Sequence, residues 1–156
     1  MTFDGDEDPQ RELIRELAMR LLARREHSRV ELCRKIGDRG HDDTLTREVL
    51  DELESERWLS DERFAEGFLR ERSGRGQGPR RIGHELRRRG VDDAIVERVL
   101  DEAGVDWRAA ARAARSKRFP GGAPEDRAQA AQQARFLERR GFTAEQVRAA
   151  LKEEEQ

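Results

Sequence analysis

Residues 58–90 read WLSDERFAEGFLRERSGRGQGPRRIGHELRRRG, and this stretch decides the fold. Ser60 is a typical helix N-cap, and Phe64, four residues later, is placed to form a hydrophobic staple with Leu59. Phe64 and Phe68 then recur at helical spacing among charged residues. The pattern predicts an amphipathic helix whose aromatic side is buried.

A glycine-rich elbow follows this helix. The run from Ser73 to Gly78 contains three glycines, which cost too much backbone entropy for the helix to continue. Pro79 suits the first turn of a second helix. We expect Gly76 and Gly78 to provide a positive φ or a close approach between these two helices.

The same arrangement recurs along the chain. Gly40 and Gly90 are 50 residues apart, Gly141 comes 51 residues after Gly90, and the first two glycines open segments that match at seven of thirteen positions. The apolar pairs Leu32/Ile82 and Ile36/Leu86 keep the same offset. A fixed period of this length indicates tandem units, each with a middle helix that ends at a glycine.

The predicted fold is therefore all-α, with three tandem three-helix repeats in an elongated, curved array. We assign a disordered acidic N-terminus to residues 1–9 and the three repeats to residues 10–56, 57–104 and 105–156. The first helix is expected to bury Leu13, Ile14, Leu17, Ala18, Leu21 and Leu22. Ser28 and Glu31 have capping-box spacing, and Asp43 or Thr44 is expected to cap the third helix.

Composition narrows the class of protein. The chain has 156 residues, of which 35% are apolar and 42% charged, so small local cores are expected rather than one deep core. No segment has the roughly 20 apolar residues of a membrane span, and the acidic N-terminus is unlike a signal peptide. One cysteine, Cys33, excludes an internal disulfide. We expect a cytoplasmic protein.

The sequence indicates no catalytic, metal or cofactor site. The three histidines are scattered, no His or Cys spacing resembles a zinc site, and Cys33 is interpreted as a small core residue. The aspartate pairs at 42–43 and 92–93 directly precede predicted helices, where caps are expected. The glycine run at 74–78 lacks the lysine of a nucleotide-binding loop. We expect a protein that is not an enzyme.

Charge is strongly segregated although the net charge is only −2. Residues 70–90 carry a net of +6 and residues 38–56 a net of −6. Arginines precede the three glycines at similar places, so stacked repeats would align them in a basic stripe. Any single arginine there could simply complement a helix dipole. For the set we predict partner binding by Arg25, Arg72, Arg75, Arg80, Arg81, Arg87, Arg88, Arg89, Arg139 and Arg140.

Four segments resemble the signatures of the RecX family of regulatory proteins. They are LLARREHS at 21–28, WLSDERFA at 58–65, GQGPRRI at 76–82 and FLERRGF at 136–142, and they occur in the family's order. The resemblance covers roughly residues 11–151. Ser60 stands where the family has Asn or Asp, and the third repeat has few large apolar residues.

The resemblance implies a modulator, usually an inhibitor, of the RecA recombinase. Such proteins consist of three-helix repeats and lie in the groove of the RecA filament on single-stranded DNA, where they hinder filament growth, ATP hydrolysis and strand exchange. This role would affect DNA repair, recombination and the SOS response. We expect a monomer that also makes weak direct DNA contact. The alternative is a DNA- or RNA-binding helical module that acts without RecA.

Overall fold

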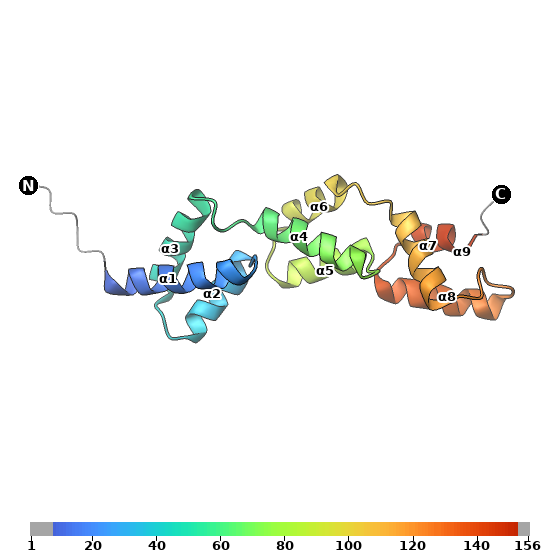
Figure 1. Cartoon of the computed structure of the whole chain (residues 1–156), viewed down its shortest axis with the longest axis horizontal. Helices are drawn as coiled ribbons and strands as arrows, with labels where there is room; N and C mark the ends of the chain where they lie inside the picture. The colour runs from blue at the N-terminus through green and yellow to red at the C-terminus, as the bar shows by residue number, and fades with distance from the viewer. Residues whose placement is uncertain (1–7, 153–156) are drawn as a thin grey trace, which may run out of the picture.

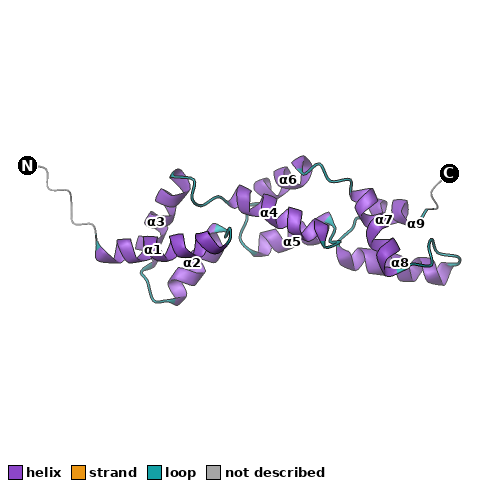
Figure 2. Ribbon diagram, viewed as in Figure 1, coloured by secondary structure: helices purple, strands orange, loops and turns teal. Residues whose placement is uncertain are grey.

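The computed structural model describes residues 8–152, which form α-helices and no strands. Groups of three helices follow one another along a single long axis, with the first and the last of the described helices near opposite ends (Figures 1 and 2). All of the extensive helix–helix contacts join helices of the same three-helix unit. The predicted all-α architecture of three-helix repeats is confirmed.

The first repeat contains α1 (Pro9–Arg24), α2 (Arg29–Asp38) and α3 (Asp43–Ser55). Asp8 caps α1, so residues 8 and 9, which we had placed in a disordered N-terminus, begin this helix; residues 1–7 of that prediction lie outside the described part. Ser28 and Glu31 form the predicted capping box of α2. The cap of α3 is Asp42, one residue before the two candidates named from the sequence.

The second repeat contains α4 (Asp61–Gly74), α5 (Pro79–Arg88) and α6 (Asp93–Glu102). Ser60 caps α4 as predicted, by accepting a hydrogen bond from the Arg63 amide. The helix continues through Ser73 and Gly74, further than the glycine content suggested, and the chain turns at Gly76, where φ is +83°.

The third repeat contains α7 (Trp107–Arg118), α8 (Arg127–Arg140) and α9 (Ala144–Leu151). Its core is small, because two of its five buried apolar residues are alanines; the five are Ala111, Leu137, Phe142, Val147 and Ala150. The first two repeats bury larger side chains, including Ile14, Leu50 and Leu53 in one and Phe64, Phe68 and Leu86 in the other.

Two packing predictions were wrong. Leu13 is 54% exposed, because it lies at the edge of the α1 stripe rather than in it. Leu59 is buried in the first core and Phe64 in the second, so Leu59 seals the repeat before it and does not staple the helix after it.

Candidate partner-binding surface

The repeats meet through the ends of their middle helices. At junction one, which joins repeats one and two, the Ser28 hydroxyl at the start of α2 donates to the Arg89 carbonyl at the end of α5, at 2.7 Å. The Arg89 guanidinium forms an ion pair with Glu31 at 2.6 Å, and Gly90 lies against the side chain of Val30.

Junction two, between repeats two and three, has the same plan but uses the backbone. Gly78 begins α5 without a side-chain cap, and its amide donates to the Arg140 carbonyl of α8 at 2.7 Å. The Arg80 amide donates to the Gly141 carbonyl at 2.9 Å. The start of α5 is thus capped by the end of α8, which satisfies donors that helix termini otherwise leave unpaired.

Both junctions place the positive end of one helix dipole against the negative end of the next. The N-terminus of α2 meets the C-terminus of α5, and the N-terminus of α5 meets the C-terminus of α8. Because arginines precede both glycines, each junction also gathers cationic side chains around it.

Six of the ten predicted binding arginines make internal contacts. Arg25 and Arg89 both reach Glu31, Arg75 pairs with Glu71 at 2.9 Å, and Arg87 pairs with Asp93 at 2.7 Å. The guanidinium of Arg72 stacks on the Phe68 ring at 4.6 Å. Arg140 donates to the Arg75 carbonyl at 3.3 Å. Arg89 makes two kinds of internal contact, because its guanidinium also stacks on the Phe68 ring at 5.1 Å.

The other four arginines are exposed and have no ion pair within residues 8–152: Arg80, Arg81, Arg88 and Arg139. Arg88 and Arg139 each stand two residues before the glycine that ends a middle helix, so they occupy equivalent places in repeats two and three. The corresponding residue of repeat one is Asp38. At this position of the repeat, an arginine without an ion pair in the described chain therefore occurs only in the last two repeats.

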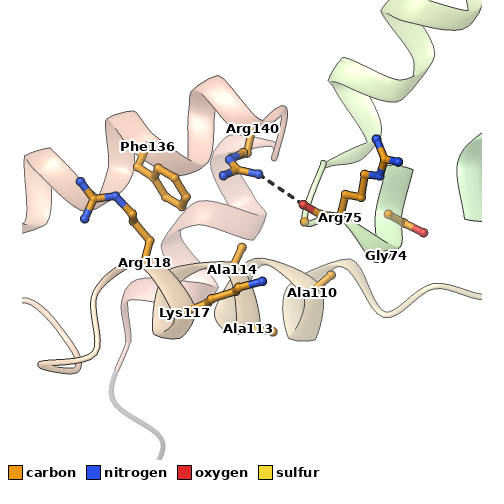
Figure 3. A pocket seen from close by; sticks show the side chains of 11 residues that line it. Gly74, Arg75, Ala110, Ala113, Ala114, Lys117, Arg118, Phe136 and Arg140 are labelled. Atoms are coloured by element: carbon orange, nitrogen blue, oxygen red, sulfur yellow. Dashed lines mark hydrogen bonds between the residues drawn. The ribbon is translucent and has the colours of Figure 1, made fainter. Parts of the chain in front are cut away.

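Junction two gathers several positive charges that have no acidic partner in the described chain. Besides the predicted arginines, the end of α7 brings Lys117 and Arg118 to this junction, where they line a cavity with Arg75 and Arg140 (Figure 3). Among all these cations only Arg75 forms an ion pair in the described part of the chain. Sequence reasoning missed Lys117 and Arg118, although the basic run at 115–118 before a glycine- and proline-rich loop was a visible signal.

Comparison with known proteins accounts for the three-helix repeat. The three three-helix domains of RecX match in order at residues 15–53, 60–100 and 106–151. The chain belongs to the RecX family. It is 56% identical over 139 residues to "Regulatory protein RecX" of Halorhodospira halophila, covering 89% of this chain and 86% of that one. It is 48% identical over 134 residues to the protein of that name in Pseudomonas putida (strain GB-1), covering 86% of each chain.

Solved RecX structures share the fold. The crystal structure of RecX from Lactobacillus salivarius has a TM-score of 0.78 at 18% identity, and the match covers 91% of this chain and 94% of that one. A second RecX crystal structure has a TM-score of 0.75 at 14% identity and covers 90% of this chain and 71% of the other. The three-repeat arrangement is thus a RecX fold that persists at low sequence identity.

Two titratable groups, the partly buried Glu31 and the buried His27, lie beside junction one of this RecX-family chain. Burial alone would raise the pKa of Glu31, but hydrogen bonds and charge from Arg89 and Arg25 hold that pKa below its usual value. His27 is 2% exposed, and burial lowers its pKa further than its bond to the Arg25 carbonyl raises it. The Lys35 Nζ lies 2.9 Å from Nε2 of His27. This contact fits a neutral imidazole whose Nε2 accepts a hydrogen bond from the lysine.

Within residues 8–152 of the RecX-family chain, no three His, Cys, Asp or Glu side chains are grouped so that they could hold a metal ion. No helix in that range is long and apolar enough to span a membrane.

Proposed function

We propose that this protein binds the RecA recombinase filament on single-stranded DNA and inhibits its ATPase activity, its growth and strand exchange. Through these effects it would influence DNA repair, recombination and the SOS response. Membership of a family of regulatory proteins supports this role, and so does the basic surface at the repeat junctions. The protein would act in the cytoplasm, as a monomer and without catalysis of its own.

The observation that carries the proposal is the repeated, unpaired arginine. Arg88 and Arg139 sit at equivalent places on successive repeats, and both are exposed without an ion pair in the described chain. Like charges placed this way repel one another unless solvent or a partner neutralises them. A nucleoprotein filament offers regularly spaced phosphates and acidic side chains, so a rigid array of repeats can meet several of them at once.

In this mechanism the protein inhibits RecA because it occupies the groove of the filament. An elongated protein that lies along a filament groove stands where subunits would have to rearrange for ATP hydrolysis or strand exchange. It needs only shape, charge and a stiff connection between its repeats. The backbone hydrogen bonds of junction two and the ion pair of junction one provide that stiffness.

The test is an ATPase titration of RecA on single-stranded DNA. Combined substitution Arg88→Glu and Arg139→Glu should leave helicity and melting close to wild type, because neither side chain has an ion pair with a described residue to lose. It should raise the half-inhibiting concentration at least about tenfold, equivalent to about 1.4 kcal/mol of binding free energy.

A matched control changes the same amount of charge elsewhere. Arg20 on α1 and Arg127 at the start of α8 are exposed, lie outside both junctions, and also lack ion pairs within the described residues. Glu52 and Glu54 are less suitable for charge reversal, because they pair with Arg11 and Arg29. Full inhibition by the Arg88/Arg139 variant, or equal loss in the Arg20→Glu, Arg127→Glu control, would refute the basic-stripe mechanism.

Direct binding of DNA or RNA is the second candidate, and the same unpaired arginines favour it. In that case the protein should bind single strands without RecA, with a logarithmic salt slope of about −0.7 per phosphate contacted. A steep slope that the Arg88/Arg139 variant flattens, together with unchanged RecA ATPase, would select this alternative.

A further inference from the structure

A cavity of about 400 Å³ lies between the second and third repeats (Figure 3). Its floor consists of the methyl groups of Ala110, Ala113 and Ala114, which lie along one side of α7. Phe136 of α8 forms one wall, and the last turn of α4 at Gly74 forms another. Ligand pockets typically enclose about 300–1,000 Å³, so the space is large enough for a side chain rather than for water alone.

Cations surround this apolar floor. Arg118 and Arg140 lie on either side of Phe136, and Lys117 extends along the alanines (Figure 3). The Arg75 guanidinium is turned away and pairs with Glu71, so it contributes little charge to the cavity. No acidic residue of the described chain lines the space. An occupant therefore meets three positive charges above an uncharged, methyl-lined surface.

The aromatic ring in the wall is already engaged. Phe136 packs edge-on against Phe119, with ring centroids 5.5 Å apart, and carries the Arg140 guanidinium at 5.0 Å. A platform for a nucleobase needs an aromatic face that is free for stacking. The cavity instead offers alanine methyls and the aliphatic stems of Lys117 and Arg118.

We propose that this cavity binds one apolar side chain of an acidic protein segment, whose flanking carboxylates pair with Lys117, Arg118 and Arg140. A peptide supplies both parts of the match within a few residues, because an apolar anchor and carboxylates can be sequence neighbours. A nucleic acid strand would supply the negative charge but no aliphatic group for the floor. This contact is distinct from the Arg88/Arg139 surface of the proposed function and is measured without recombinase.

The experiment measures binding of fluorescein-labelled acidic heptapeptides by anisotropy. The panel consists of aspartate- and glutamate-rich peptides with a central leucine, isoleucine, methionine or phenylalanine, plus one with central glycine. Wild-type protein should bind at least one apolar peptide at least about tenfold more tightly than the glycine peptide, since burial of such a side chain is worth that much or more.

Two variants localise the binding. Ala113→Phe fills the floor from an exposed position on α7 and should weaken the apolar peptide about tenfold, whereas Ala131→Phe, exposed on α8 outside the cavity, should not. Lys117→Glu should weaken every acidic peptide, and circular dichroism checks that each variant keeps its helicity.

Three outcomes overturn the proposal. They are equal affinity for the glycine and apolar peptides, binding that Ala113→Phe leaves unchanged, and absence of binding by the whole panel. A labelled oligothymidylate that binds wild type and is lost in Ala113→Phe, without peptide binding, would assign the cavity to nucleic acid. Each result is independent of the ATPase titration, so failure of this proposal can be distinguished from failure of the proposed function.

Discussion

Substitution of Gly90 by alanine measures how tightly the first two repeats are joined. Gly90 has φ +86°, and a Cβ there would lie 2.4–2.9 Å from the Val30 side chain. The conflict includes the Cβ of Val30 itself at 2.5 Å, which no rotation of that side chain can remove. Gly40 has the same φ of +86° at the equivalent place in repeat one, but a Cβ there meets no atom of residues 8–152 within 4 Å.

Comparison of the two glycine-to-alanine substitutions therefore separates the cost of a strained backbone from the cost of a steric clash. Left-handed backbone costs a residue other than glycine about 1–2 kcal/mol, and both substitutions incur it. Forcing an extra methyl into a packed contact costs about 1–3 kcal/mol more, which applies only to Gly90→Ala. We expect Gly40→Ala to lower the free energy of unfolding by about 1–2 kcal/mol and Gly90→Ala by about 2–5 kcal/mol.

The assay is urea unfolding of full-length variants followed by far-UV circular dichroism. Because the repeats are joined by short contacts, Gly90→Ala is also expected to broaden the transition as repeats one and two unfold less cooperatively. Equal losses for the two variants would refute the reasoning. They would mean that junction one yields easily and does not hold the repeats in a fixed relation.

The remaining stability predictions use the same assay. Phe64→Ala should cost about 3–5 kcal/mol because Phe64 is 4% exposed, whereas Arg70→Ala on the exposed side of α4 should change stability by less than about 0.5 kcal/mol; equal losses would contradict the helical register. Gly78→Ala should cost about 1–3 kcal/mol or more, since its Cβ would lie 2.5 Å from the backbone of Gly141, and a neutral result would disprove that contact. Stability should fall as the pH drops from about 7.5 to about 5.5, because burial lowers the pKa of His27 in the folded state and the unfolded chain takes up the proton first. His27→Gln should flatten this dependence, and an unchanged slope would exclude His27 as its source.

Much of the fold could be predicted because its signals are local. Helix caps depend only on residues a few positions apart, as in the capping box of Ser28 and Glu31 and the cap at Ser60. Each glycine that ends a middle helix is also a local signal, and these glycines recur every 50–51 residues. Repetition then multiplied these short-range signals, so the three-helix unit was visible even where its third copy is poor in large apolar residues.

The contacts between repeats could not be predicted in the same way. Gly78 has an ordinary φ of −91°, and a side chain there is disfavoured by the backbone of Gly141 and Phe142, far along the chain. Likewise three consecutive arginines have different roles: Arg87 pairs with Asp93, Arg88 is unpaired in the described chain, and Arg89 reaches Glu31 in the neighbouring repeat. Their sequence is uniform, and their partners lie on other helices.

The helix-end junctions also explain how the array stops. Ser28 and Gly78 each begin a middle helix twelve residues before its terminal glycine, whereas the residue at that place in repeat three, Gln129, lies inside α8. The start of α8, capped by Asp126, thus lies three residues earlier than the starts of α2 and α5. A second molecule that placed the end of its α2, at Gly40, against this start would meet a helix end in a different register. A head-to-tail contact of that kind does not close on itself and would grow into fibres. We therefore expect the longer α8 to disfavour such polymerisation.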